Sequence, residues 1–154
     1  MADSVKFNFH RPGMGSVGQY QMSAVPYVSA NIPVPALITL SSVTSCSFDS
    51  VSRFVTIVNE ATGANKPLRV GFSFHGVAGL DSGSQNNYFV LDNGESYTGE
   101  WRVRQIYMTG APARNIGNVV ETDRSDTTAS VIAGLTGIES GNLPNNWTGS
   151  TGVG

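Results

Sequence analysis

Apolar and polar side chains alternate most regularly in residues 68–75. Leu68, Val70, Phe72 and Phe74 share one face of an extended chain, and Arg, Gly, Ser and His occupy the positions between them. A period of two is typical of a β-strand with one face in a core. This segment is therefore predicted to be a strand.

Other strands are predicted where β-branched and aromatic residues gather between turn signals. These segments are residues 36–47, 53–59, 88–91, 101–108 and 127–135. The run Asp92, Asn93, Gly94 predicts a tight turn after residues 88–91. In residues 101–108 the alternation reverses at Gln105, which predicts a bulge or a change of sheet there. No long window has a helical period, so the pattern indicates an all-β chain.

Short strands separated by glycine-rich turns favour two packed sheets. We expect a single all-β domain, a β-sandwich or jelly-roll-like fold, over residues 36–138. Residues 1–35 are predicted to form an extended N-terminal arm, and residues 139–154 a flexible polar C-terminal tail. An eight-stranded jelly roll results if the arm supplies one strand.

The predicted arm is rich in Gly, Ser and Pro and carries aromatic residues without a fixed period. Phe7, Phe9, Tyr20 and Tyr27 are candidate assembly contacts, because buried aromatic side chains are favoured as interface anchors. The alternative is that these rings close the protein's own barrel, in which case the arm becomes an edge strand.

Charged residues make up 13% of the chain, against about 25% in an average soluble domain. The net charge is -2, which disfavours direct binding to nucleic acid. A neutral surface rich in hydroxyl groups suits packing against other proteins. The chain has neither the pattern of a signal peptide nor an apolar run long enough to span a bilayer, so we expect a soluble protein made in the cytoplasm, without a membrane partner.

Side chains with catalytic potential are few. His10 and His75 are not near other metal-type ligands at a recognised spacing. Cys46 is the only cysteine and is predicted to be a small buried residue; nothing local supports its pairing with His75 as nucleophile and base. We expect no catalytic residue and no cofactor.

Two charged groups have competing interpretations. Asp92, Glu95 and Glu100 surround a tight turn, where calcium is one hypothesis, but turn geometry and cross-strand pairing explain them better, so no metal site is predicted. Arg102 and Arg104, together with Arg114 and Arg69, could form a basic face. That face is either solvated or part of a salt-bridged subunit interface, and Arg102 and Arg104 are the candidate contacts.

Two segments resemble small virion proteins of tailed bacteriophages. They are residues 88–107, YFVLDNGESYTGEWRVRQIY, and residues 129–138, ASVIAGLTGI. In those proteins a strand, a short NGES-like turn and a strand with alternating basic and apolar residues belong to a β-sandwich. That sandwich decorates or cements the capsid, often as a trimer.

The resemblance implies a non-enzymatic capsid decoration or cement protein that binds the major capsid protein of a phage head. It implies a homo-oligomer, with a trimer favoured, on the capsid surface of the virion. Alternatives are another virion component, such as a head fibre base, tail or coat protein, and an enzyme of unrecognised type. A further alternative is a carbohydrate-binding module, whose platform would be Tyr88, Tyr97, Trp101 and Tyr107 if these side chains face outward.

Overall fold

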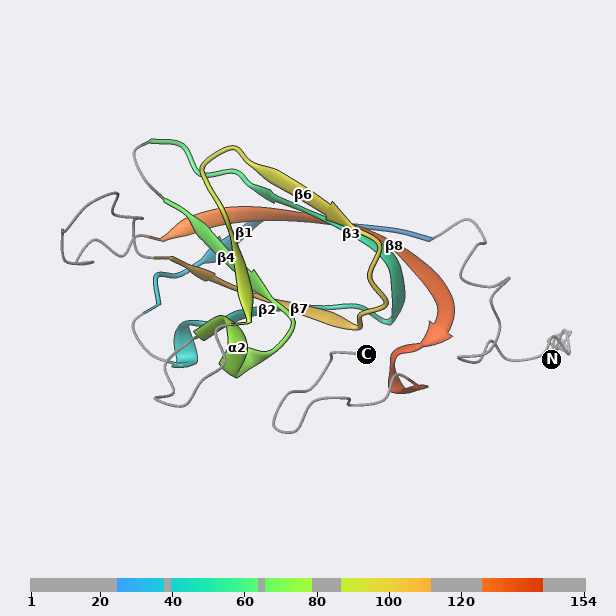
Figure 1. Cartoon of the computed structure of the whole chain (residues 1–154). Coiled ribbons are helices and arrows are strands. Elements are labelled where there is room, and N and C mark those ends of the chain that lie inside the picture. Colours follow the sequence, from blue (N-terminus) through green and yellow to red (C-terminus); the bar gives the residue numbers. More distant parts are fainter. Residues whose placement is uncertain (1–24, 38–39, 64–65, 79–86, 112–125, 143–154) are drawn as a thin grey trace, which may run out of the picture.

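The structure is a computed structural model, and it describes residues 25–37, 40–63, 66–78, 87–111 and 126–142. Two antiparallel four-stranded sheets pack face to face (Figure 1). The expected all-β sandwich is therefore confirmed. The strands are β1 (Val25–Val34), β2 (Thr44–Ser47), β3 (Ser50–Asn59), β4 (Leu68–Gly71), β5 (Tyr88–Leu91), β6 (Ser96–Gly99), β7 (Gln105–Gly110) and β8 (Thr127–Glu139). Three short helical turns accompany them: η1 (Leu40–Ser42), α2 (Phe74–Ala78) and η2 (Ser140–Asn142).

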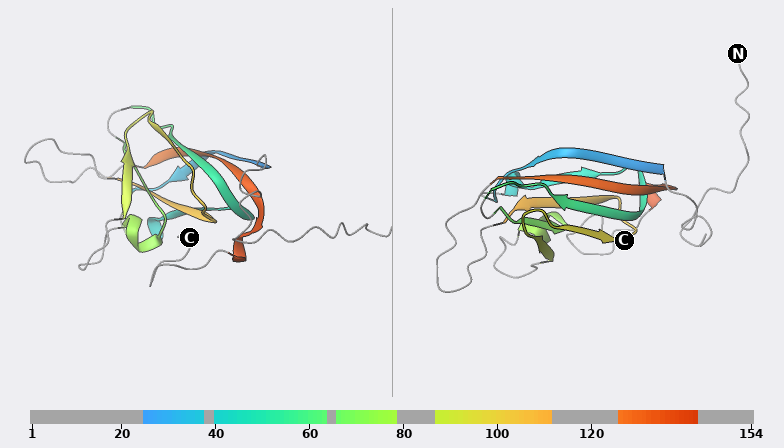
Figure 2. Two further views of the ribbon diagram at one scale, coloured as in Figure 1. Left: turned by 45° about the vertical axis from the view of Figure 1, so that its right-hand side comes forward. Right: turned by 90° about the horizontal axis from the view of Figure 1, so that it is seen from above.

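Strand pairing follows a nested pattern. β1 pairs with β8, β2 with β7, β3 with β6 and β4 with β5, all antiparallel, as in one long hairpin. Folding this hairpin over adds the pairs β3–β8 and β4–β7. The resulting orders, β1-β8-β3-β6 in the first sheet and β2-β7-β4-β5 in the second, are those of a jelly roll. Figure 2 shows the strands of the first sheet side by side.

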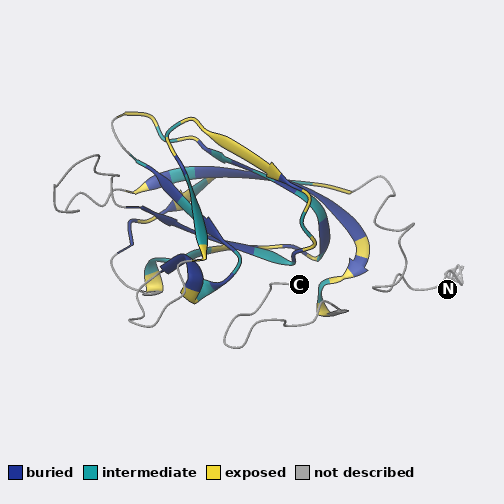
Figure 3. Cartoon of the chain, in the orientation of Figure 1, coloured by how far each residue is buried: buried dark blue, intermediate teal, exposed yellow. Residues whose placement is uncertain are grey.

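The core lies between the two sheets and draws on the inward positions of both. Its most deeply buried side chains are aliphatic or Met, with 0% of their surface exposed. They include Val55, Ile57 and Val131 from the first sheet and Val70, Ile106 and Met108 from the second. In Figure 3 the strands that supply this core contain many buried residues, drawn in dark blue, while β6 is largely exposed and drawn in yellow.

β1 corrects the expected boundary between arm and sandwich, because residues 25–34 form an edge strand of the first sheet. Its register shifts between Ser29 and Ile32, where Asn31 has a φ of 54°. This bulge lets Tyr27 on one side and Ile32 on the other both pack on the core. The bulge also breaks the period of two, which is why the sequence pattern did not predict a strand. Residues 1–24 of the expected arm lie outside the described residues.

The strand predicted at residues 68–75 is too long. β4 ends at Gly71, and α2 begins at Phe74. Ser73 caps this helix: its Oγ accepts a hydrogen bond from Gly76 N at 3.1 Å, and its carbonyl accepts one from Val77 N at 3.1 Å. The cap at Ser73 therefore starts a helix where the alternating pattern predicted that the strand would continue.

Of the two alternatives predicted near Gln105, a bulge or a change of sheet, the structure shows a change of sheet, and the strand predicted at residues 101–108 begins only at Gln105. β6 belongs to the first sheet and β7 to the second, so residues 101–104 cross between them. Ser52 holds this crossing, since its N donates to Val103 O at 2.9 Å and its Oγ accepts from Val103 N at 3.2 Å. Ser140 lies at the same end of the domain: Phe48 N donates to Arg104 O at 2.8 Å, and Ser140 Oγ donates to Phe48 O at 2.7 Å, so residues 139–142 belong to the sandwich. The rest of the expected tail, residues 143–154, lies outside the described residues.

Candidate functional site

The carboxylates around residue 93 serve the turn between β5 and β6. Glu95 N donates to Asp92 O at 3.0 Å, and Asp92 N donates to Glu95 Oε2 at 2.8 Å. Asn93 ties this turn to the β3–β4 connection, because its Oδ1 accepts from Lys66 N at 2.8 Å and its Nδ2 donates to Gly63 O at 2.6 Å. Within residues 25–37, 40–63, 66–78, 87–111 and 126–142, no group of three or more His, Cys, Asp or Glu side chains could hold a metal ion.

Cys46 is buried on β2, as the sequence predicts. Its Sγ lies 3.2 Å from Tyr27 Oη, across the open side between the two sheets. Burial raises the pKa of the Cys46 thiol above its ordinary value, which disfavours the nucleophilic thiolate. His75 is exposed on α2, where its ring packs edge-on against Phe74. The thiol is thus arranged for packing.

Among the candidate assembly contacts, only Tyr27 of the four aromatic residues lies in the described part of the chain. Its ring is half-buried, packs on the core and makes an edge-on contact with Phe48, with ring centroids 5.1 Å apart. Tyr27 therefore packs within its own domain. Phe7, Phe9 and Tyr20 lie outside the described residues.

Arg102 and Arg104 lie on the crossing between the sheets. Arg102 is exposed and Arg104 is half-buried, while Val103 between them points into the core, as the alternation predicts. Arg69 lies apart on β4, with its guanidinium 4.3 Å from the centroid of the Tyr88 ring. Arg114 lies outside the described residues, so the choice between a solvated face and a subunit interface stays open.

An uncharged patch lies on the outer side of the first sheet. Cross-strand register aligns its outward residues in rows, and the central row runs through Val28, Ile132, Thr56 and Thr98. The neighbouring rows are Pro26, Gly134 and Phe54, and Ser130, Val58 and Ser96. We call these residues the outer face; none of them is charged. Val28 is 66% exposed and Ile132 is 40% exposed, so aliphatic side chains face solvent at its centre.

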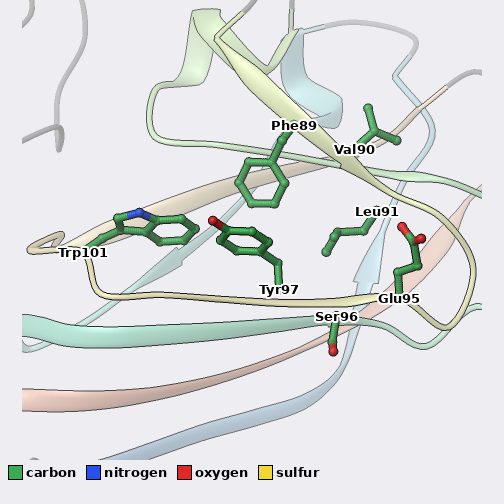
Figure 4. Close-up of a pocket in the computed structure, with 7 residues that line it drawn as sticks. All are labelled: Phe89, Val90, Leu91, Glu95, Ser96, Tyr97 and Trp101. Atoms are coloured by element: carbon green, nitrogen blue, oxygen red, sulfur yellow. The ribbon is translucent and has the colours of Figure 1, made fainter.

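A second feature is a groove between β5 and β6, the outermost strands of the two sheets on the same side of the sandwich. It has a volume of about 500 Å³ and is lined by Phe89, Val90, Leu91, Glu95, Ser96, Tyr97 and Trp101. Figure 4 shows the rings of Phe89, Tyr97 and Trp101 gathered together, with Glu95 at the opposite end from Trp101. We call this feature the aromatic groove.

The rings of the aromatic groove contact one another. Tyr97 and Trp101 are nearly parallel, with an interplanar angle of 10° and centroids 5.5 Å apart. Phe89 lies over both, 5.3 Å from the Tyr97 centroid and 6.0 Å from that of Trp101. Tyr97 is the most open of the three, at 48% exposure. Because its rings pack together, the groove presents a continuous aromatic wall.

Of the four residues that the carbohydrate alternative required to face outward, only Tyr97 and Trp101 come together. Tyr107 is buried, and Tyr88 lies beside Arg69 on the second sheet. Sequence analysis missed both the groove and β6, whose short polar sequence lacks β-branched apolar residues. The one available signal was that Tyr97, Gly99 and Trp101 share a period of two.

No protein-family model, curated protein or solved structure matches this chain. The helices among the described residues are all too short to cross a membrane. The functional interpretation therefore depends on the fold, the outer face and the aromatic groove.

Proposed function

We propose that this chain is a non-enzymatic virion structural protein, a capsid decoration or cement protein that binds and stabilises a phage head shell. The observation that carries the proposal is the uncharged outer face, with Val28 and Ile132 exposed at its centre. Soluble domains normally intersperse both signs of charge over an exposed sheet surface. A sheet face without charge, centred on aliphatic side chains, suits contact with another protein surface.

The rigidity of the sandwich supports the same role. Its two sheets share one hydrophobic core, so the outer face has a fixed shape that can match a repeated lattice of subunits. The chain as a whole is also poor in charge, because charged residues make up only 13% of it. The jelly-roll order is compatible with the role but does not specify it, because this fold serves many functions.

The size of the outer face indicates that it does not act alone. Four strands about 4.8 Å apart and three rows of outward residues about 6.8 Å apart give a face of roughly 15 by 14 Å, or about 200 Å². A stable interface buries about 800 Å² on each partner. Decoration therefore requires a second contact region, supplied by self-association of the chain.

The proposal is tested with head shells of the virus that encodes the chain, stripped of their accessory proteins. The purified chain should sediment with the shells and raise the temperature at which they rupture. Val28→Glu and Ile132→Glu should each weaken this binding at least tenfold while the thermal unfolding midpoint of the isolated chain stays unchanged. Ser45→Glu adds the same charge at an exposed position of β2 and serves as the control. A well-folded chain that does not sediment with shells contradicts the proposal.

Oligomeric state provides an independent check. Light scattering behind a sizing column should give the mass of a homo-oligomer, with a trimer favoured. A monomer that nevertheless binds a purified glycan would instead favour the carbohydrate-binding alternative.

A further inference from the structure

The aromatic groove lies between two strand edges that are free of a partner strand in the described part of the chain. β6 pairs only with β3, and β5 pairs only with β4. A free edge presents unpaired N–H and C=O groups, and an extended peptide can add to it as another strand. Ser96, Tyr97 and Thr98 of β6 are all exposed, so this edge is accessible.

The lining of the groove defines what such a peptide must carry. Phe89, Tyr97 and Trp101 form the aromatic wall, and Glu95 is the one charged residue that lines the groove. Asp92, also exposed, precedes it in the same turn. In β-strand addition, alternate side chains of the peptide enter the groove and give the specificity. The occupant should therefore carry apolar or aromatic residues at every second position and positive charge nearby.

The chain contains one segment with this pattern near its start. Residues 5–11 read VKFNFHR, with apolar residues at 5, 7 and 9 and with Lys6 and Arg11 as positive charges. Alternate side chains of a strand lie about 6.8 Å apart. This spacing is close to the 5.5 Å between the Tyr97 and Trp101 centroids, so two successive aromatic side chains can contact this pair of rings together. The segment lies outside the described residues, and only its sequence enters this comparison.

We propose that residues 5–11 of a second copy of this chain bind in the aromatic groove as an added strand along β6. Phe7 and Phe9 contact the rings of Tyr97 and Trp101, and Lys6 or Arg11 lies near Glu95. Exchange of this segment between copies supplies the second contact region that decoration requires. That the segment comes from a second copy, and not from the same copy, rests on the proposed function. The fit of the segment to the groove is independent of that function.

The first test uses the full-length chain with Trp147→Phe, so that Trp101 is its only tryptophan. Light scattering should show an oligomer, and acrylamide should quench Trp101 poorly. Adding Phe7→Ala and Phe9→Ala should convert the protein to a monomer and increase the quenching constant at least twofold. Unchanged mass and quenching in this variant would overturn the proposal. A full-length monomer with a protected Trp101 would also overturn it, because the groove would then be filled by its own copy.

The second test supplies the segment in trans. A synthetic peptide of residues 1–12 should bind the Phe7→Ala/Phe9→Ala protein saturably and restore the protection of Trp101. Tyr97→Ala in the protein should weaken this binding at least tenfold, and Thr98→Ala, on the same strand but on the outer face, should leave it unchanged. A peptide that does not bind, or a neutral glycan that protects Trp101 where the peptide does not, overturns the proposal. Neither measurement uses shells, so a failure here is distinct from a failure of the decoration role.

Discussion

The indole of Trp101 occupies the space that a side chain on Gly99 would need. A Cβ built on Gly99 would lie 2.2 Å from Cε2 of Trp101, well inside van der Waals contact. The same indole packs edge-on against Phe72, with centroids 4.7 Å apart. The last residue of β6 therefore fixes the ring that closes one end of the aromatic groove.

We predict that Gly99→Ala lowers the free energy of unfolding by about 2 kcal/mol, because a rigid ring must move to admit the methyl group. Displacement of the ring should also shift the fluorescence maximum of Trp101 to longer wavelength in the Trp147→Phe background. Urea unfolding and emission spectra measure both effects. Gly141→Ala is the control, since a Cβ there has no atom within 4 Å. An unshifted spectrum together with unchanged stability would show that the indole does not hold this position.

Gly94 is constrained differently from Gly99. Its backbone conformation, and not a steric clash with a neighbouring side chain, disfavours other residues there. Gly94 has a φ of 76°, and a Cβ there meets nothing within 4 Å. Gly94→Ala should therefore cost about 1 kcal/mol, the usual penalty for an L-residue in the left-handed region. Gly94→Asn should cost less, since Asn tolerates this region. Equal stabilities for the Ala and Asn variants in urea unfolding would contradict this explanation.

Asn59 joins three parts of the chain at the end of β3. Its Nδ2 donates to Lys66 O at 2.9 Å and to Leu91 O at 3.1 Å, and its Oδ1 accepts from Thr127 Oγ1 at 2.9 Å and from Ala61 N at 3.1 Å. Asn59 is fully buried, so removal of its amide leaves several polar groups without partners.

Asn59→Ala should therefore lower the free energy of unfolding by about 3 kcal/mol, and Thr127→Val by about 1 kcal/mol. The double variant should lose less than the sum, because the two side chains share one hydrogen bond. Thr128→Val, a half-buried neighbour on β8, is the control. Strict additivity in urea unfolding would indicate that the Asn59–Thr127 bond contributes nothing.

The Tyr27–Cys46 contact predicts a loss of stability in alkaline solution. Burial raises the pKa of the Cys46 thiol, and the hydrogen bond to Cys46 followed by burial raises the pKa of the Tyr27 hydroxyl. The thiol of the unfolded chain ionises near its ordinary pKa of about 8.5, while the folded chain keeps its proton. Above that pH the unfolded state binds fewer protons, so the free energy of unfolding falls as pH rises toward the folded pKa.

Urea unfolding at pH 7 to about 9.5, the range over which a free thiol ionises, measures this effect. The wild-type protein should lose stability over this range, and Cys46→Ala should show a shallower slope, although it is less stable at pH 7. Disulfide-exchange labelling of Cys46 should be slow until the protein unfolds, because this residue is only 6% exposed. Identical slopes for the two proteins would exclude the thiol as the cause.

Candidate sites were less accessible to sequence analysis than the fold. The buried state of Cys46 and the role of the Asp92–Gly94 turn followed from residue chemistry, because a small thiol favours burial and Asn-Gly favours a tight turn. The aromatic groove did not, because Phe89 is on one sheet and Tyr97 on the other, and no local pattern records which edge strands lie side by side. Tyr27 likewise had two interpretations. Its ring packs on Phe48, and this contact joins β1 of the first sheet to the end of β2 in the second, which no local pattern predicts.

The sequence by itself determined the all-β class and most of the strands, since these depend on a local period of two and on turn residues. Near Gln105 it indicated either a bulge or a change of sheet, and the tertiary structure decided for the change of sheet. Only the tertiary structure decided that residues 25–34 are an edge strand, because the bulge at Asn31 breaks the period and the strand gains its hydrogen bonds from β8, about a hundred residues away. The tertiary structure alone also aligned Val28, Ile132, Thr56 and Thr98 in one uncharged row. Cross-strand register sets such rows, and it is a property of paired strands that no single segment contains.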